Sequence, residues 1–406
     1  MRHIAIITKS FEGSTMPLIE AFLKKGYVVD YYQMTLRYTQ GVYESFDLPI
    51  KTRLYTTKEI IDFHHPGLQR FNQFAMKGTF RMFQFSNFII VDSWKRMPLN
   101  IASKCFLKKV ARIIATHEYD WVNVVGNDMN SAIISVLLKK NHVNVLHSIH
   151  EVCRNHLTRS QMHPICSYLL QNDIPLNLFS KKSEDDLLHF LKDKRPVYSV
   201  IPFSLFTGYQ EFPISEICEL KGEDDYVLFY GYIVDYKGLD ILYEASKLLR
   251  LRELRKKIVV AGFGKVDYLD IISRDENFIL INRFLNNHEI TNLIRRCHVV
   301  VCPYRSSSQT GITQTVFNFR KPIVGTRVPA FTSTIEDRKT GLLVDVEDAE
   351  QLADAIHKSY NGQLYSEMCD NISRLLARTA QDWIDIAGQY EIRYIYSFCF
   401  ICMSIS

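Results

Sequence analysis

Short apolar runs rich in valine, isoleucine and aromatic residues recur along the whole chain, and segments with apolar residues at helical spacing separate them. Several runs show no alternation of apolar and polar residues, as is typical of strands buried on both faces of a parallel sheet. The strands expected in the first half span residues 3–8, 27–32, 121–126, 143–148, 176–180 and 197–202. Those expected in the second half span residues 226–231, 257–262, 278–282, 298–303, 322–326 and 341–344.

Helical patterns lie between these strands, for example over residues 239–250 and 288–297. Alternation of strands and helices in both halves predicts an α/β protein with two Rossmann-like, doubly wound domains. A segment of mixed composition, residues 204–225, separates the two series. We therefore expect a first domain over residues 1–203 and a second over residues 204–379. Such domains would face each other across a cleft at the carboxyl ends of their strands, where open α/β sheets bind ligands.

A long aromatic and basic stretch, residues 53–118, falls between the second and third expected strands. Several of its side chains could line one helix face with basic residues nearby: Phe71, Phe74, Met82, Phe83 and Phe85, and Arg70, Lys77 and Arg81. One interpretation is a pair of helices that covers the first sheet. The other is a surface that rests on anionic lipid through its basic and aromatic side chains together.

The composition is that of an ordinary soluble protein, with 47% hydrophobic and 23% charged residues. The longest apolar runs are far shorter than the roughly 20 residues that span a bilayer. The N-terminus becomes polar too soon for a secretory signal, so we expect a cytoplasmic protein. Nine cysteines without a repeated spacing argue against a disulfide framework. The pair Cys399 and Cys402 lies in an aromatic tail without a nearby histidine, which disfavours zinc or redox chemistry there.

The net charge of +5 is unevenly distributed. Residues 1–200 hold 26 Lys and Arg against 17 Asp and Glu, whereas residues 201–406 hold 23 against 27. The basic first half suggests an anionic partner, either a membrane surface or a phosphorylated substrate. Nucleic acid is not indicated, because no helix-turn-helix, RNP or zinc-finger pattern accompanies the charge.

Two glycine-containing motifs follow expected strands of the second half. Lys237 and Gly238 come shortly after Gly231, and a lysine beside a glycine suits a point charge for a phosphate. Gly262 and Gly264 end the next strand. The full dinucleotide fingerprint is missing, and a plain turn explains these two glycines equally well.

A third motif follows the strand that ends near Pro303. Residues 306–311, SSSQTG, supply hydroxyl and amide groups, and a helix is expected to open at Gly311. The first N–H groups of a helix have no intrahelical partner and suit phosphate or sugar oxygens. A run this polar between a buried strand and a helix serves a ligand more often than it serves packing.

The order of these motifs resembles a known family. Lys-Gly, Gly-x-Gly, Asn-Arg-Phe, Pro-Tyr-x-Ser with Thr-Gly, and Lys-Pro-Ile-Val-Gly-Thr follow one another at strand ends. Together they are similar to the donor domain of retaining GT-B glycosyltransferases, specifically glycosyltransferase family 4, closely over about residues 226–358. The resemblance implies a nucleotide-diphosphate sugar as donor substrate and no metal or other cofactor. It also implies that a C-terminal helix, residues 380–396, completes the first domain.

The resemblance assigns donor-binding residues by position. Lys237 matches the lysine that meets the donor diphosphate, and it is our first catalytic candidate. The arginine usual just after the glycine of that strand is replaced by Tyr232, so one phosphate charge is missing. Arg283 and Phe284 fall where the family's backbone meets the nucleotide base. The other donor-binding candidates are Gly13, Gly262, Ser307, Thr310, Gly311, Ile312 and Thr313.

The paired glutamates of the family would fall at Ser307 and Thr315, and neither residue is acidic. A subgroup of the family has a glutamine in place of the second glutamate, and Gln314 looks like that glutamine. Its amide could hydrogen-bond the ribose diol as the carboxylate would, with less strength because the bond is not charge-assisted. Gln314 is therefore our second catalytic candidate.

The resemblance places the acceptor side in the first half. The loop over residues 8–16, with Gly13, corresponds to a glycine-containing loop near the reaction centre. His150, at an expected strand end, is the third catalytic candidate and would contact the transferred sugar; a purely structural histidine is the alternative. Phe179 and Phe203 stand where the family often has histidines.

These residues predict a retaining glycosyltransferase that moves a hexose-type sugar from a nucleotide-diphosphate sugar to a glycan or lipid-linked acceptor. We expect a role in surface polysaccharide biosynthesis, in the cytoplasm or peripherally on the inner face of the membrane. The rival is a degenerate GT-B protein that binds a sugar nucleotide or a partner transferase without turnover, which Tyr232 and the missing glutamates favour. A phosphorylase would need more phosphate-binding arginines or a cofactor lysine.

Overall fold

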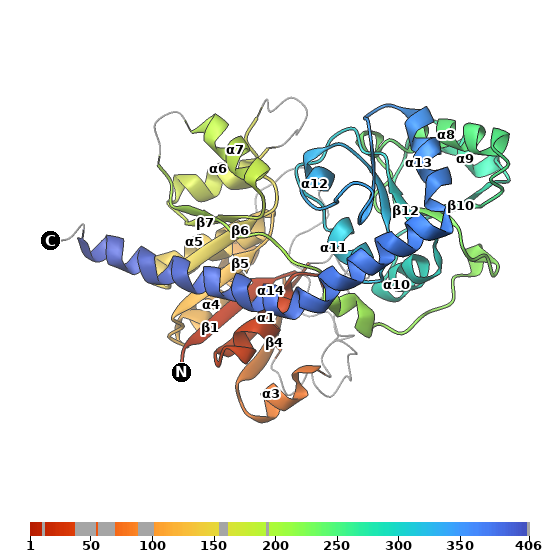
Figure 1. Ribbon diagram of the computed structural model, residues 1–406. Helices are drawn as coiled ribbons and strands as arrows, with labels where there is room; N and C mark the ends of the chain where they lie inside the picture. Colours follow the sequence, from red (N-terminus) through yellow and green to blue (C-terminus); the bar gives the residue numbers. More distant parts are fainter. Residues whose placement is uncertain are drawn as a thin grey trace. The chain divides into compact units, whose positions relative to one another are not determined.

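The computed structural model describes residues 1–9, 13–36, 54–55, 70–87, 101–153, 161–191 and 195–403 of the chain. The chain divides into two compact units, residues 1–204 together with 380–406, and residues 205–379. We call them the N-terminal unit and the C-terminal unit. Each is built on one mainly parallel sheet with helices packed against it (Figure 1).

The N-terminal unit contains an eight-stranded sheet in which β3 alone is antiparallel to its neighbour. Six parallel strands follow β4 across the sheet. The order is β3 (Leu54–Tyr55), β4 (Phe80–Asn87), β2 (Val28–Leu36), β1 (His3–Thr8), β5 (Trp121–Val125), β6 (Val145–Ile149), β7 (Leu176–Leu178) and β8 (Tyr198–Val200). The helices are α1 (Thr15–Lys24), α3 (Asn72–Met76), α4 (Ile101–Ala115), α5 (Met129–Lys140), α6 (Pro164–Gln171) and α7 (Lys181–Phe190).

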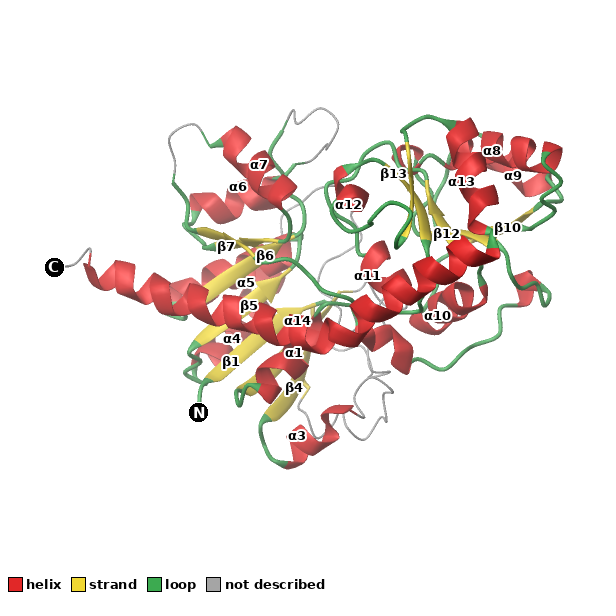
Figure 2. Ribbon diagram, in the orientation of Figure 1, coloured by secondary structure: helices red, strands yellow, loops and turns green. Residues whose placement is uncertain are grey.

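The C-terminal unit contains a six-stranded sheet in which every pairing is parallel (Figure 2). The order is β11 (Phe278–Asn282), β10 (Ile258–Gly262), β9 (Val227–Tyr230), β12 (Val299–Cys302), β13 (Ile323–Thr326) and β14 (Gly341–Val344). The helices are α8 (Leu239–Leu251), α9 (Leu269–Arg274), α10 (Asn287–Arg296), α11 (Ile312–Phe317), α12 (Pro329–Thr332) and α13 (Ala349–Ser359). A last helix, α14 (Gly362–Met403), begins in this unit and ends in the N-terminal unit.

The central strands are buried on both faces, and this explains their unbroken apolar sequences. Every residue of β6, β10 and β12 is buried, because helices cover both sides of a parallel sheet. The twelve strands expected from the sequence all form, and β2 continues four residues beyond its expected end. The segment that separates the two series of strands belongs to the C-terminal unit from Leu205 onward, and Phe212 and Leu220 are buried there.

The expectation that the aromatic side chains after residue 70 share one helix face is wrong. Met82, Phe83 and Phe85 lie in β4, which the sequence analysis missed. Phe71 and Met82 are buried in the core, so these two side chains offer nothing to a lipid surface. Phe83 stacks on Tyr32 of the neighbouring strand, with ring centroids 4.6 Å apart. Residues 56–69 and 88–100 of the same stretch lie outside the described residues.

The C-terminal part of α14 belongs to the packing of the N-terminal unit. Tyr394 stacks on Trp121 with ring centroids 4.2 Å apart. Asn177 Nδ2 donates a hydrogen bond of 3.1 Å to Tyr390 Oη. Cys399 and Cys402 lie further along this helix, beyond the last side chain that the structure describes. Within the described ranges, no helix is both long enough and apolar enough to cross a membrane.

A buried polar network ties the amino ends of four strands in the N-terminal unit. Asp30 is fully buried, and Arg81 donates two hydrogen bonds to its carboxylate at 2.6 and 2.7 Å. Tyr119 Oη also donates to Asp30, and Tyr32 Oη lies 2.7 Å from Tyr119 Oη. His3 Nε2 lies 3.2 Å from the same carboxylate. The buried charge is therefore paired and hydrogen-bonded, as its position requires.

We expect Asp30→Asn to lower the free energy of unfolding by roughly 3 kcal/mol or more, because it leaves the guanidinium of Arg81 without its counter-ion. Urea unfolding followed by circular dichroism measures the change. Lys24→Ala is the matched control in the same unit, because it removes an exposed pair with Glu20 and should cost about 1 kcal/mol or less. Equal losses of unfolding free energy in the two variants would contradict the stabilising role of the buried Asp30–Arg81 pair.

Candidate functional site

Lys237 lies at the carboxyl edge of the C-terminal sheet, between β9 and α8. The chain passes Gly231, and a single 3-10 turn, Asp235–Lys237, leads into α8 through Gly238. A Cβ on Gly238 would lie 2.0 Å from Pro303 O, and the residue has φ +67°. Glycine alone tolerates both conditions. The Lys-Gly pair is therefore fixed by contact with the end of the neighbouring strand β12.

The ammonium of Lys237 is buried and forms no ion pair with the residues that the structure describes. Lys237 exposes 8% of its surface, and its Nζ lies 5.1 Å from the centroid of the Tyr304 ring. A Cβ on Gly231 would lie 2.7 Å from this Nζ, so the glycine makes room for the ammonium. Burial lowers the pKa of Lys237 to about 8, and the Cys302 thiol acts in the opposite direction. Such a cation is a candidate for contact with an anionic ligand.

Gly262 and Gly264 serve the close approach of two backbone segments. A Cβ on Gly262 would lie 1.8 Å from Gly231 O, and one on Gly264 would lie 2.0 Å from Ile233 O. Ile233 N donates to Phe263 O at 3.0 Å. The Gly-x-Gly motif is thus accounted for by the joining of the ends of β9 and β10. A donor-binding role for Gly262 stays a prediction.

The loop after β12 leads into α11 at Gly311, as the sequence predicts. Gln314 of this helix exposes 8% of its surface, and no described residue donates a hydrogen bond to its Oε1. A buried acceptor without a donor costs folding free energy. Because β9 and β12 are neighbours, Gln314 and Lys237 both follow strands at the same edge of one sheet. A ligand with an anionic group and a hydroxyl group would satisfy both.

The hydroxyl groups at the positions of the two family glutamates, Ser307 and Thr315, donate hydrogen bonds to backbone carbonyls nearby. Ser307 Oγ donates to Gln309 O at 3.0 Å, and Thr315 Oγ1 donates to Gly311 O at 2.9 Å. The protons of these two hydroxyls are therefore engaged inside the protein, and the donor-binding role of Ser307 stays a prediction.

The other candidates in this loop differ in exposure and in their partners. Thr310 Oγ1 accepts from Ile312 N at 3.3 Å, and the buried Thr313 accepts a bond from Thr334 at 3.1 Å. Gly311 is exposed and Ile312 is half-buried. Thr310 and Thr313 thus support the loop through their side chains. Main-chain contacts of residues 310–313 with a donor stay a prediction.

Three half-exposed aromatic rings, Tyr232, Phe263 and Phe284, follow β9, β10 and β11 at this sheet edge. Phe263 and Phe284 stack with centroids 4.4 Å apart, and Tyr232 meets Phe284 edge-on at 6.3 Å. The guanidinium of Arg283 is held by Glu219 and Glu289 at 2.8 and 2.7 Å. The rings, rather than this guanidinium, are available to a flat ligand group. The sequence analysis missed Phe263, although its place directly after a strand-end glycine was a usable signal.

In the N-terminal unit, His150 follows β6 and lies against two phenylalanines. The centroid of its ring is 4.8 Å from that of Phe179 and 5.8 Å from that of Phe203, and the two phenylalanines stack at 4.0 Å. Its backbone N–H donates to Asn127 Oδ1 at 2.7 Å. The positions where the family often has histidines therefore form an apolar wall beside His150.

His147, three residues earlier, has a structural role. It is fully buried in β6, and its Nε2 lies 2.8 Å from Gly126 O. Burial lowers the pKa of His147 to about 4, so its ring is neutral at ordinary pH. Of the two histidines in this segment, only His150 stands at the edge where a ligand could reach it.

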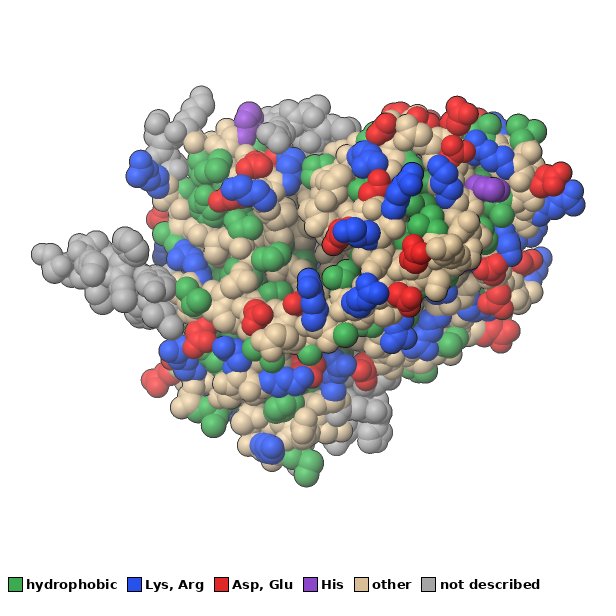
Figure 3. Space-filling view, viewed as in Figure 1, with side chains coloured by type: hydrophobic (Ala, Val, Ile, Leu, Met, Phe, Trp, Pro, Cys, Tyr) green, Lys and Arg blue, Asp and Glu red, His purple; other side chains and the backbone are tan. Residues whose placement is uncertain are grey.

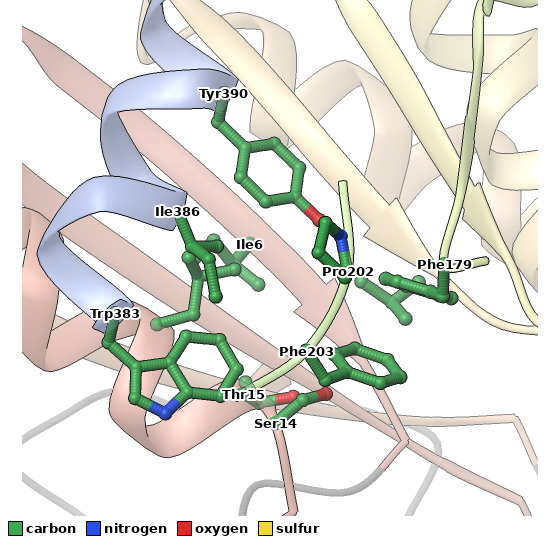
Figure 4. A pocket seen from close by; sticks show the side chains of 11 residues that line it. Ile6, Ser14, Thr15, Phe179, Pro202, Phe203, Trp383, Ile386 and Tyr390 are labelled. Carbon is green, nitrogen blue, oxygen red and sulfur yellow. The ribbon is translucent and has the colours of Figure 1, made fainter. Parts of the chain in front are cut away.

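Phe179 and Phe203 also line a small pocket of the N-terminal unit. Figure 4 shows Trp383 and Tyr390 from α14 and the hydroxyl groups of Ser14 and Thr15 around it. The free volume is about 10 Å³, at the lower limit for a single water molecule. The pocket in this state is therefore too small for a sugar.

Gly13 comes directly before Ser14, which lines this pocket. A Cβ added to Gly13 would meet nothing within 4 Å. Residues 10–12 of the same loop lie outside the described residues. The donor-binding role of Gly13 stays a prediction. Where side chains are described, no group of three or more His, Cys, Asp or Glu is placed to hold a metal ion.

The chain is similar to known proteins in sequence and in fold. Residues 224–361 match the family described as glycosyl transferases group 1. Alpha-D-kanosaminyltransferase of Streptomyces kanamyceticus is 28% identical over 172 residues, 40% of this chain and 44% of that protein. O-antigen chain mannosyltransferase C of Escherichia coli is 27% identical over 183 residues, 43% of this chain and 48% of that protein. The chain thus matches less than half the length of these curated relatives.

Among solved structures, one from Escherichia coli described as trehalose-6-phosphate bound with UDP-2-fluoro glucose has a TM-score of 0.63. The alignment covers 97% of this chain and 98% of that chain at 11% identity, so it supports the fold alone. The two parallel sheets with their helices match this neighbour across nearly the whole length. Residues 224–361 are thus similar to the group 1 glycosyltransferases, and the chain that contains them has the two-domain α/β fold known as GT-B.

Proposed function

We propose that the chain is a glycosyltransferase that moves a hexose-type sugar from a nucleotide-diphosphate sugar to an acceptor hydroxyl, with retention at the anomeric carbon. The observation that supports this proposal most strongly is a pair of buried groups in the C-terminal unit that lack an interaction partner among the described residues. The ammonium of Lys237 lacks an anion and Gln314 Oε1 lacks a donor among the described residues. A nucleotide-diphosphate sugar supplies an anion in its diphosphate and hydrogen-bond donors in its hydroxyl groups.

The chemistry of transfer follows from the charge of the leaving group. Breaking the bond between the anomeric carbon and the diphosphate oxygen leaves negative charge on the diphosphate, which a nearby cation stabilises. Lys237 would provide that cation. Its burial strengthens the attraction, because charges interact more strongly where water is excluded. Gln314 would hold a hydroxyl of the ribose and so fix the position of the diphosphate relative to Lys237.

The aromatic rings at the same edge suit the nucleotide base. Base stacking on an exposed aromatic ring contributes roughly 1–3 kcal/mol and tolerates different bases. Phe284 and Phe263 would receive the base, which agrees with the position that the family resemblance implies for Phe284. Tyr232 extends the apolar surface where the family carries a phosphate-binding arginine. The site therefore relies on one cation and on ring contacts.

The acceptor is assigned more broadly, as a glycan or a lipid-linked intermediate in surface polysaccharide biosynthesis. The relative named O-antigen chain mannosyltransferase C supports this class. The excess of basic residues in the first half is compatible with an anionic acceptor or a peripheral membrane position. On the face in Figure 3, however, basic side chains of the N-terminal unit are interspersed with acidic ones. Of the two acceptor classes, a soluble glycan is therefore the simpler choice for a first assay.

A binding protein without turnover is the second candidate. Tyr232 in place of arginine and the internally bonded Ser307 and Thr315 favour it, since three charged groups of the family are absent. Calorimetry with nucleotide sugars and detection of the transferred sugar separate the two candidates. Binding without any product would favour this one.

Donor binding should depend on the charge of Lys237. We expect Lys237→Met to lower the affinity for UDP-glucose or GDP-mannose at least tenfold at neutral pH, because the diphosphate loses its cation. In the unchanged protein the affinity should fall by up to tenfold per pH unit above about 8, since the free ammonium then loses its proton. Calorimetry across the pH range, followed by mass spectrometry of the transfer products, tests both statements. Affinities that are equal in the two proteins at every pH would refute the site.

The same substitution should make the protein more stable. The pKa of Lys237 is about 8 in the folded protein and 10.5 in an ordinary lysine, so the unfolded chain binds this proton more tightly. The stability of the unchanged protein therefore rises with pH between these two values. Lys237→Met should raise the free energy of unfolding by roughly 1–3 kcal/mol at neutral pH and by little above pH ~10.5.

Urea unfolding at both ends of this pH range measures the stability change. Lys265→Met is the control, because Lys265 is exposed and its loss should leave stability nearly unchanged at either pH. A Lys237→Met protein that is less stable than the unchanged one at neutral pH would contradict the description of this lysine as an uncompensated buried charge.

Gln314 should contribute through its amide oxygen. Gln314→Met keeps the size of the side chain and removes the acceptor, and we expect about a tenfold loss of donor affinity. Gln314→Glu keeps an acceptor and should retain binding. The exposed Gln363, changed to Met, is the matched control. Donor binding that is unaffected in Gln314→Met would remove this residue from the site.

A further inference from the structure

Two turns interlock at the carboxyl edge of the C-terminal sheet. The first, residues 235–238, carries Lys237, and the second, residues 303–305, follows β12. Arg305 N donates to Tyr236 O at 2.7 Å. Pro303 O occupies the space that a side chain at Gly238 would need. The position of Lys237 is therefore coupled to the turn that contains Arg305.

The guanidinium of Arg305 strengthens this coupling through five hydrogen-bond contacts. Nη1 donates to Asp235 O at 2.6 Å and to Asp240 Oδ1 at 2.9 Å. Nη2 donates to Asp240 Oδ2 at 2.6 Å and to Glu347 Oε2 at 3.2 Å. Nε donates to Glu347 Oε1 at 2.5 Å. Asp235 and Asp240 flank Lys237 in sequence, so the guanidinium binds the chain both before and after this lysine.

This arrangement leaves Arg305 unable to bind the donor itself. A guanidinium has five N–H donors, and the five contacts use all of them. Two carboxylates, Asp240 and Glu347, offset its charge. Hydrogen bonds from Arg305 keep the pKa of Asp240 below its ordinary value although burial acts the other way. The charge of Arg305 is thus neutralised by carboxylates of the protein. Any effect of Arg305 on the binding of a diphosphate must therefore act through the position of residues 235–238.

We propose that Arg305 is a positioning residue for donor binding, which holds the turn of residues 235–238 so that the ammonium of Lys237 faces the diphosphate. The proposal rests on the proposed function for the identity of the ligand. A lysine side chain is a flexible four-carbon stem, so it does not by itself fix the position of its ammonium group. With tyrosine at position 232 instead of arginine, no second cation there would correct a misplaced Lys237. The bidentate grip of Arg305 on Asp240 supplies the missing rigidity.

The first test compares Arg305→Gln and Arg305→Lys with Arg250→Gln. Arg250 lies in α8 and pairs with Asp275 at 3.0 Å, so its variant removes a similar arginine–aspartate pair away from the turn. Calorimetry with UDP and with GDP gives the affinity as a function of pH. Arg305→Gln should lose at least tenfold in affinity and Arg305→Lys should recover part of it. Arg250→Gln should bind as the unchanged protein does, even where urea unfolding shows a similar loss of stability.

The second test needs no nucleotide and therefore separates this proposal from the proposed function. Acylation of Lys237 by acetic anhydride, quantified by mass spectrometry across pH, reports its protonation and accessibility. The groups that face its ammonium are Cys302 and Tyr304. In Arg305→Gln the pH midpoint of acylation should move from about 8 toward the ordinary value of 10.5, and the rate at pH values above the midpoint, where the amine is unprotonated, should be higher because the side chain is more accessible. Arg250→Gln should keep the midpoint of the unchanged protein.

The outcomes are distinct. If Arg305→Gln keeps both the nucleotide affinity and the acylation midpoint of Lys237, the positioning role is refuted. If the unchanged protein binds neither UDP nor GDP, the proposed function fails for these nucleotides, and the acylation midpoints alone decide the role of Arg305. If Arg305→Gln does not fold, the comparison of Arg305→Lys with Arg250→Gln decides it by the same two measurements.

Discussion

The buried ammonium of Lys237 is the constraint on which the C-terminal site depends. Gly231 makes room for it, the Tyr304 ring covers one side of it, and burial lowers its pKa to about 8. A chain selected only for stability would not keep a cation there, because removing charge from water without a counter-ion costs free energy. The arrangement is reasonable where an anion arrives from solution and supplies the missing charge.

The turns around Lys237 show how a parallel sheet builds such a site from backbone contacts. The ends of β9, β10 and β12 approach so closely that Gly238, Gly262 and Gly264 have no room for a side chain. These contacts place the lysine, the aromatic rings and α11 at one edge. Arg305 then joins the turn of Lys237 to the turn after β12 through Asp240. Rigid support of this kind is what a site that relies on Lys237 as its cation would require.

The surroundings of His150 in the N-terminal unit are apolar rather than polar. Phe179 and Phe203 stack beside His150 where the resembled family often carries histidines. The adjoining pocket, which both rings line, has a free volume of only about 10 Å³. Apolar side chains such as these limit the access of water to the His150 ring.

The sequence by itself determined twelve of the strands, the two-domain α/β class and the places of Lys237 and Gln314 at strand ends, because apolar runs and glycine turns are local signals. It did not reveal β4, whose aromatic residues were read at helical spacing. Only the tertiary structure decided that the ammonium of Lys237 and the amide oxygen of Gln314 are buried without partners in the described part of the chain, and that Arg305 is committed to Asp240 and Glu347. Burial and pairing depend on residues far apart in the chain, which meet only when the sheet assembles.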